Sequence, residues 1–163
     1  NGRRRQRQMC IRDRVVDLLF QDIKYADLTN IKIKEAKGRF EIVNDSPLKI
    51  IDGAHNYEGV EILLRNYENK YGNLNTDIFL GFKKGKDINS ILNLIIGKKN
   101  YNLHLIEDDT FFDQEITKEI GYLLNKHGKN YKIASLEQFK KNKNPSILLG
   151  SLYLIGEYKK REL

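Results

Sequence analysis

The sequence predicts an α/β domain in which helices cover a mostly parallel β-sheet. Short apolar runs alternate with amphipathic segments from residue 38 to the end of the chain. The amphipathic segments are about 10–14 residues long, which suits crossover helices between parallel strands. Capping residues mark several of them, with Asp before the first apolar position and Gly after the last. Together these observations predict a sheet with helices packed on its faces.

Each expected element follows from its local pattern. Strands are expected where apolar residues run on or alternate, over residues 38–43, 48–51, 77–82, 101–106, 131–134 and 146–150. Helices are expected where apolar residues recur with helical spacing, over residues 58–71, 88–97, 114–128, 135–141 and 151–160. Asp87 and Asp113 are the expected N-caps of two of these helices. Two further short helices are expected at residues 15–20 and 26–37.

The first fourteen residues differ from the rest of the chain. They hold six arginines and one aspartate, and so contribute +5 to a formal net charge of +7. They also contain the only Cys and the only Met, Cys10 and Met9. The composition changes at Val15, and we interpret residues 1–14 as adapter-like, non-native and disordered sequence that takes no part in the fold. The alternative is a basic arm that binds nucleic acid.

Three segments therefore make up the expected organisation: residues 1–14, a remnant of a preceding domain or linker helices at 15–37, and an α/β domain at 38–163. No apolar run approaches ~18 residues, so no transmembrane helix is expected. No disulfide framework and no signal peptide are visible. We expect a cytoplasmic monomer that binds neither nucleic acid nor membrane.

Two loops between a strand and a helix carry the polar residues of interest. Ligands of parallel sheets bind where strands end and helices begin. After the apolar run at 50–51, Asp52 supplies a carboxylate, His55 can exchange a proton near neutral pH, and Asn56 can cap the next helix. The second loop is Gly150–Ser151. The alternative for the first loop is that Asp52 and Asn56 only cap, and that His55 is incidental.

Three motifs, in order, carry a resemblance to a known family. They are "GRFEIV" at 38–43, "IIDGAHNYEG" at 50–59 and "ILLGSLYLIGE" at 147–157. With the strand–helix units between them, they resemble the C-terminal domain of folylpolyglutamate synthase, often bifunctional with dihydrofolate synthase, in the Mur ligase superfamily. The resemblance covers residues 38–163 and implies a Rossmann-like α/β domain.

The resemblance also implies roles for individual residues. Arg39 and Asp52 match family residues that contact ATP from this domain. His55 and Asn56 match the same loop, which faces the nucleotide phosphates and the incoming glutamate, and His55 is the candidate catalytic residue. Ser151 matches a serine near the substrate. The family's usual proline after the asparagine is replaced by Tyr57.

The reaction implied is that of an ATP-dependent acid–amino-acid ligase of the tetrahydrofolate synthase type. It activates a folate carboxylate as an acyl phosphate, which the amine of glutamate then attacks. ATP and Mg²⁺ are the expected cofactors, and glutamate and a folate the expected partners. No G-x-x-x-x-G-K-[ST] loop is present, and "GFKKGKD" at 81–87 does not fit this pattern. The resemblance implies that the phosphate-binding loop and the magnesium ligands belong to a larger N-terminal domain that this chain lacks. No metal ligand is therefore expected here, and the chain alone is expected to be inactive.

Two other functions stay open. One is the C-terminal domain of a cell-wall Mur ligase, although the ending "GSLYLIGE" favours the folate branch. The other is a non-catalytic α/β binding domain. His104, in the middle of a predicted strand, is expected to contact a neighbouring strand and to have no role in the reaction.

Overall fold

The computed structural model describes residues 36–107 and 114–161. Within the chain, residues 35–163 form one compact unit. The helices expected at 15–20 and 26–37 lie outside the described residues, except for Ala36 and Lys37, which are not helical. The expected cap Asp113 also lies outside them.

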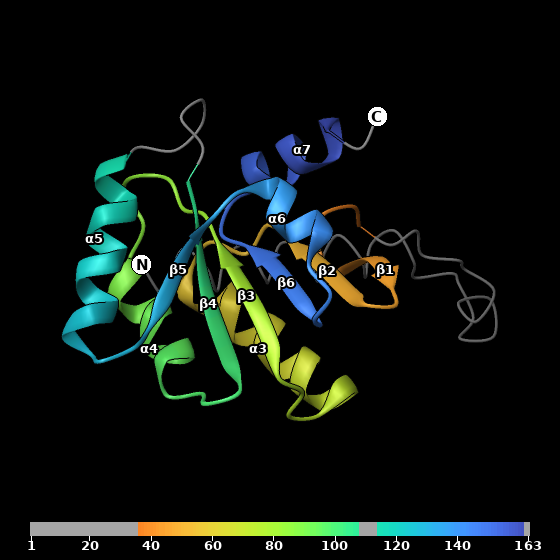
Figure 1. Cartoon of the computed structure of the whole chain (residues 1–163), viewed down its shortest axis with the longest axis horizontal. Helices are drawn as coiled ribbons and strands as arrows, with labels where there is room; N and C mark the ends of the chain where they lie inside the picture. Colours follow the sequence, from red (N-terminus) through yellow and green to blue (C-terminus); the bar gives the residue numbers. More distant parts are fainter. Residues whose placement is uncertain (1–35, 108–113, 162–163) are drawn as a thin grey trace, which may run out of the picture. The chain divides into compact units, whose positions relative to one another are not determined.

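Six strands form a single sheet, as the apolar runs predict (Figure 1). Its spatial order is β1-β2-β6-β3-β4-β5. The strands in chain order are β1 (Glu41–Asp45), β2 (Leu48–Asp52), β3 (Thr76–Leu80), β4 (Tyr101–Ile106), β5 (Tyr131–Ala134) and β6 (Ser146–Leu149). All neighbours pair in parallel except β1 and β2, which are antiparallel.

Two predicted strand boundaries are wrong. The first strand begins at Glu41, so Arg39 lies in the loop before it rather than in the strand. The strand predicted at 77–82 ends at Leu80, because Gly81 and Phe82 already belong to the connection to the next helix.

Helices cover both faces of the sheet, as expected for parallel strands (Figure 1). Apolar side chains of α3 (Tyr57–Tyr71), α4 (Ile88–Ile96) and α5 (Gln114–Lys126) share one hydrophobic cluster with the sheet. Those of α6 (Leu136–Lys141) and α7 (Leu152–Lys160) share a second cluster on the opposite face. The sheet therefore separates two cores, and its carboxyl edge is left to loops and helix N-termini.

Polar side chains cap the N-termini of several of these helices. Asp87 Oδ1 accepts a hydrogen bond from the backbone N–H of Ser90 at 3.2 Å, so the predicted cap of α4 is confirmed. Ser135 and Gln138 form a reciprocal capping box at the start of α6. The helices thus begin where the sequence places polar residues after strands, which fixes the loops at the carboxyl edge.

Candidate functional site

The antiparallel first strand brings together two segments that are distant in sequence. Because β1 runs opposite to β2, the residues before β1 lie beside the residues that follow β2. The backbone N–H of Gly53 donates to the carbonyl of Gly38 at 2.8 Å and joins the two segments. Arg39 and Asp52 therefore meet at the carboxyl edge of the sheet.

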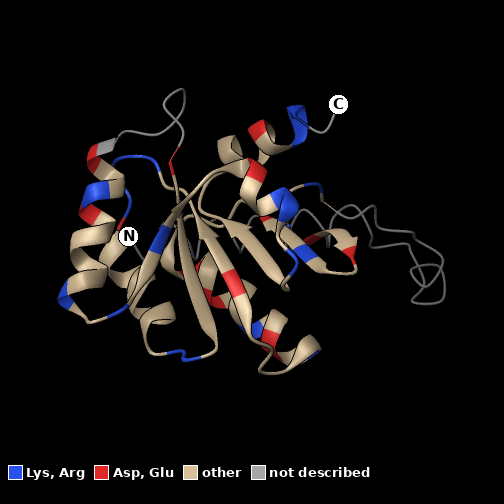
Figure 2. Cartoon of the chain, in the orientation of Figure 1, with Lys and Arg blue, Asp and Glu red and all other residues tan. Residues whose placement is uncertain are grey.

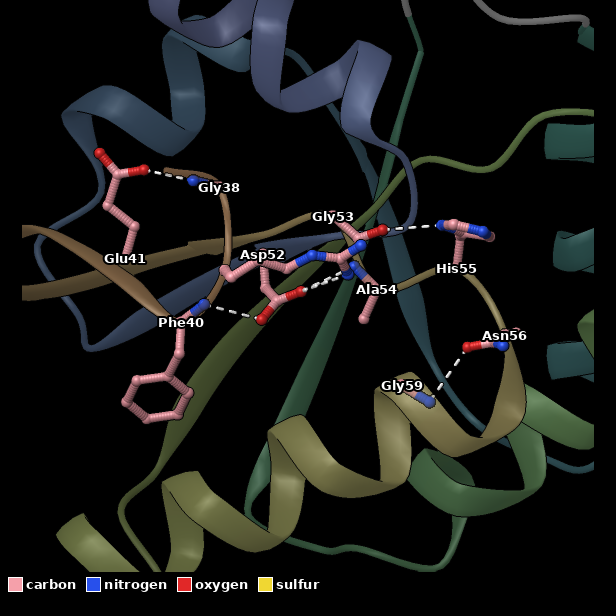
Figure 3. Close-up of polar contacts among 10 residues, drawn as sticks. Gly38, Phe40, Glu41, Asp52, Gly53, Ala54, His55, Asn56 and Gly59 are labelled. Atoms are coloured by element: carbon pink, nitrogen blue, oxygen red, sulfur yellow. Dashed lines mark hydrogen bonds and ion pairs between the residues drawn. The ribbon is translucent and has the colours of Figure 1, made fainter. Parts of the chain in front are cut away.

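Asp52 ties this edge together through its carboxylate. Only 7% of the residue is exposed. Its Oδ2 accepts from the backbone N–H of Phe40 at 2.8 Å, and its Oδ1 accepts from that of Ala54 at 2.7 Å (Figure 3). The guanidinium Nη1 of Arg39 lies 3.9 Å from Oδ1, and half of the Arg39 side chain is exposed. Asp52 thus orders both segments and holds a cation that solvent, or a ligand, can reach.

The segment before β1 has an unusual backbone. Gly38 has a φ of 73°, and Phe40 has a φ of 44°, which is uncommon for a residue with a side chain. The hydrogen bond from the Phe40 N–H to Asp52 supports this conformation. Strained residues of this kind concentrate at ligand sites, so Phe40 joins the candidate site although no sequence pattern marked it.

Gly53 lies against the side chain of Leu152, the first residue of α7. A Cβ at position 53 would lie 2.3 Å from the Cδ2 atom of this leucine. Because Leu152 is 48% exposed, a side chain at 53 would turn the leucine toward solvent and remove the contact. The motif glycine therefore lets the loop after β2 and the last helix approach each other.

His55 is held by the same loop. Its Nδ1 lies 2.9 Å from the carbonyl oxygen of Gly53, and this oxygen can only accept, so Nδ1 carries the proton (Figure 3). In the neutral ring Nε2 is then an acceptor, and it has no hydrogen-bond partner among residues 36–107 and 114–161. The ring can accept a proton or a hydrogen bond from a ligand at Nε2.

Asn56 is the N-cap of α3, as the alternative interpretation of the loop holds. Its Oδ1 accepts from the backbone N–H of Gly59 at 3.0 Å (Figure 3). A Cβ on Gly59 would lie 2.8 Å from that oxygen, so this glycine leaves room for the cap. The cap uses one acceptor position of this oxygen and leaves the amide nitrogen of Asn56 as the donor that can bind a ligand.

Ser151 caps α7 and, at 7% exposure, is as buried as Asp52. Its Oγ accepts from the backbone N–H of Tyr153 at 3.2 Å. The preceding Gly150 has a φ of 125°, and a Cβ there would lie 2.5 Å from the carbonyl oxygen of Gly81. The loops after β6 and β3 therefore touch, and Ser151 begins a helix beside both.

One pair at this edge was not predicted. The Nζ atom of Lys83 lies 3.5 Å from the centre of the Tyr153 ring, a cation–π contact. Tyr153 is 68% exposed. In the sequence, Tyr153 lies within the motif "GSLYLIGE" and Lys83 follows a predicted strand. Only the order of strands in the sheet shows that the two side chains meet.

Of the predicted site residues, Arg39 and Asp52 are in direct contact. His55 joins them through Gly53, and Ser151 lies next to the Leu152 side chain that packs on Gly53. In the described ranges, no group of three or more His, Cys, Asp or Glu side chains could hold a metal ion. No helix there is long and apolar enough to cross a membrane.

Comparison with solved structures finds the fold in ligases, whereas no protein-family profile and no curated protein matches the chain. The folylpolyglutamate synthase of Thermotoga maritima is 24% identical, with a TM-score of 0.64 over 83% of this chain and 32% of that one. That of Mycobacterium tuberculosis, complexed with ADP and AMPPCP, is 14% identical, with a TM-score of 0.68 over 90% and 37%. The UDP-N-acetylmuramate-alanine ligase of Thermotoga maritima is 15% identical, with a TM-score of 0.59 over 91% and 35%.

These likenesses confirm the predicted fold class. The six-stranded, mostly parallel sheet with helices on both faces is the fold that the chain shares with parts of these ligases. The chain spans about a third of the length of each of these proteins. At identities of 24% and below, the comparisons establish the fold, and the chemistry has to be argued from the site.

Proposed function

We propose that this chain is the nucleotide-facing C-terminal part of an ATP-dependent amide ligase of the folylpolyglutamate synthase type. Such an enzyme adds glutamate to a folate through an acyl-phosphate intermediate. The observation that carries the proposal is the Arg39–Asp52 pair, in which a half-exposed guanidinium is held at the carboxyl edge of the sheet. This edge is where open α/β sheets bind their ligands.

Arg39 is the residue proposed to meet the nucleotide directly. Its guanidinium is permanently charged and can bind a phosphate with two parallel hydrogen bonds or stack on adenine. Asp52 has only 10% of its side chain exposed, because backbone N–H groups occupy its carboxylate. Its proposed contribution to ATP binding is to fix the loop and the position of Arg39, with the exposed edge of the carboxylate available to ribose.

The acceptor side of the reaction is assigned to His55, Asn56 and Ser151. The Nε2 atom of His55 is the acceptor in the tautomer that the Gly53 carbonyl selects, so it can take a proton from the ammonium of incoming glutamate. The amide nitrogen of Asn56 and the hydroxyl proton of Ser151 are donors that can meet a substrate carboxylate.

The proposal includes partners outside this chain. Placing and activating the γ-phosphate of ATP requires a phosphate-binding loop and Mg²⁺, which we assign to a second, N-terminal domain. The purified chain alone is then expected to show no ADP release with ATP, folate and glutamate. In the cell we place the complete enzyme in the cytoplasm as a monomer.

A Mur ligase of cell-wall synthesis is the second candidate. The TM-score with UDP-N-acetylmuramate-alanine ligase is 0.59, only slightly below the 0.64 and 0.68 of the two folylpolyglutamate synthases. This similarity supports the second candidate. The two candidates predict different acceptors, a folate and a nucleotide-linked muramyl substrate. A non-catalytic domain predicts neither.

The test joins the chain to the N-terminal domain of a homologous folylpolyglutamate synthase and measures steady-state kinetics with ATP, glutamate and a folate. Arg39→Ala and Asp52→Ala should each reduce kcat/KM for ATP by about ten- to a hundredfold, since each removes a charge-assisted interaction. The matched control is His104→Ala, which lies away from this edge and should leave kcat/KM near that of the parent.

Circular dichroism must show that all three variants are folded. Arg39→Ala is the more decisive change, because its side chain is half exposed and its loss disturbs little packing. If folded Arg39→Ala retains the kcat/KM of the parent for ATP, the loop does not bind the nucleotide and Asp52 is only structural. Activity with a muramyl substrate instead of a folate would transfer the assignment to the second candidate.

A further inference from the structure

A basic recess lies on the α6–α7 face of the molecule, at the end of β2 opposite Asp52. It has a volume of about 550 Å³. Side chains from two strands and two helices converge on it: Val43, Asn44, Lys49, Lys140, Tyr158 and Arg161. Three of these six are cations and none is a carboxylate. Figure 2 shows the basic residues at the ends of α6 and α7.

Lys49 is the most buried cation of the recess. It is 6% exposed, and its Nζ lies 5.9 Å from the centre of the Phe139 ring. In the described part of the chain no carboxylate lies within ion-pair distance of Nζ, which donates only to the carbonyl oxygen of Lys140. Burial lowers the pKa of Lys49. A buried ammonium without a counter-charge is costly, and two of its N–H groups are left to bind an anion.

The other two cations each have a carboxylate neighbour. Lys140 Nζ lies 3.9 Å from Glu137 Oε1, and Arg161 Nε lies 3.8 Å from Glu157 Oε1. Lys140 Nζ also donates to the carbonyl oxygen of Arg161 at 2.5 Å. Both lysines thus contact carbonyl groups at helix C-termini, a stabilising arrangement that uses one N–H of each. Helix capping accounts for the placement of the lysines but not for the concentration of positive charge.

A second polar group lies next to Lys49 on the same face of the sheet. Lys49 and Ser146 are direct partners in the parallel register of β2 and β6, so their side chains point to the same face. The Ser146 Oγ is buried and has no hydrogen-bond partner among the described residues. Ser146 is fully buried and does not line the recess, so its hydroxyl is a polar neighbour of Lys49 and not a ligand contact.

We propose that this recess binds a phosphate group, either free inorganic phosphate or the phosphate of a monoester. Three cations and the phenol of Tyr158 converge on the recess, which suits a tetrahedral dianion with three or four oxygens better than a planar carboxylate. The site is separate from the Arg39–Asp52 edge and does not depend on the proposed ligase reaction.

The test is isothermal titration calorimetry of the full chain at constant ionic strength with inorganic phosphate, a phosphate monoester such as ribose 5-phosphate, and glutamate. Phosphate should bind, and Lys49→Met should weaken it by roughly tenfold or more, since methionine keeps the apolar stem but removes the charge. The matched control, Lys118→Met, removes an exposed lysine of α5 and should leave binding unchanged. The two phosphate compounds distinguish a free anion from an esterified one.

Thermal unfolding and circular dichroism check that Lys49→Met is folded. If it is not, Lys140→Met is the second variant, and it should weaken phosphate binding as well. The proposal is overturned if phosphate does not bind, if glutamate binds as tightly, or if folded Lys49→Met binds phosphate as well as the parent does. It is also overturned if Arg39→Met abolishes binding and Lys49→Met does not, because the anion would then lie at the other edge.

Discussion

Asp52 and Asp77 are two buried aspartates at opposite edges of one sheet. They are 7% and 5% exposed. Asp52 ends β2 at the carboxyl edge, and its carboxylate accepts from two backbone N–H groups and faces an exposed arginine. Asp77 is the second residue of β3, at the amino edge, and its carboxylate accepts from three side-chain amides. Both aspartates are buried, yet their surroundings differ in kind.

The carboxylate of Asp77 is held by side-chain amides. Its donors are Asn102 at 2.9 Å, Asn142 at 2.9 Å and Asn144 at 3.1 Å, and His104 Nε2 lies 3.7 Å away. These side chains come from β4 and from the connection between α6 and β6, so the carboxylate fastens three segments together. At Asp52, by contrast, one partner is a half-exposed cation. Burial alone therefore does not distinguish the two aspartates, whereas the partners of each carboxylate do.

Electrostatics distinguish the Asp77 network further. Burial acts to raise the pKa of Asp77, but the three amides and His104 outweigh it, so its pKa lies below the ordinary value. Burial also lowers the pKa of His104, against the opposing effect of the Asp77 charge. At neutral pH the network therefore combines an ionised carboxylate with a neutral imidazole.

The largest expected effect on stability is at Asp77. Asp77→Ala removes the acceptor of three amides and should lower the free energy of unfolding by about 3 kcal/mol, since unsatisfied polar groups are costly to bury. Urea denaturation followed by circular dichroism measures this. A loss no larger than that of an exposed control such as Lys118→Ala would mean that water replaces the carboxylate and that the network is not structural.

Asp52→Ala should have a smaller effect on stability. The substitution leaves the backbone N–H groups of Phe40 and Ala54 without their acceptor. We expect this to lower the free energy of unfolding by about 2 kcal/mol. The same denaturation experiment gives the comparison. If Asp52→Ala proves more destabilising than Asp77→Ala, then Asp52 contributes more to stability than Asp77 does. The expected order of the two aspartates would then be reversed.

Acid should destabilise the amino edge in two steps, with a smaller effect than either substitution because the side chains stay in place. The pKa of His104 is lowered in the fold, so stability falls as pH drops from the ordinary histidine value to the folded value. The pKa of Asp77 is also lowered, so its contribution is present above the unfolded value and is lost as pH falls through the folded value. Urea denaturation across acidic pH tests this. His104→Gln should remove the first step, and an unchanged profile would show that another group causes it.

Arg39→Met should have the smallest effect on stability, about 0.5 kcal/mol or less, because exposed ion pairs contribute little. Its effect should instead appear in nucleotide binding by the rebuilt enzyme, that is, the chain joined to the N-terminal domain of a homologous folylpolyglutamate synthase. Thermal unfolding with and without a nucleotide measures both quantities. A clear loss of stability without a loss of nucleotide binding would mean that Arg39 has a structural role only. The sites of Asp52 and Asp77 would then no longer differ in function.

The sequence predicted most of the elements because each depends on local pattern. Continuous apolar runs gave the buried strands, and helical spacing gave α3 and α4, with Asp87 as a confirmed cap. The start of β1 was wrong because "GRFEIV" alternates from its first residues, whereas the positive φ of Gly38 and Phe40 delays pairing until Glu41. Periodicity carries no information on such turns.

The candidate site was only partly predictable. The motif "IIDGAHNYEG" placed Asp52 and His55 at a strand end, but the approach of Arg39 depends on β1 being antiparallel, which only the pairing reveals. The Asp77 network could not be predicted, because residues 77, 102, 142 and 144 are joined by sheet order and not by spacing. The roles assigned to the motif residues remain predictions until the rebuilt enzyme is assayed.

The contact between Gly53 and Leu152 links positions about a hundred residues apart in the chain. The space that a side chain at 53 would need is filled by the end of the leucine side chain, which is 48% exposed and can turn aside. In related sequences the two positions should therefore covary, with alanine at 53 found more often where position 152 carries a smaller residue. The first residue of the last helix thus influences which loops are accepted after β2.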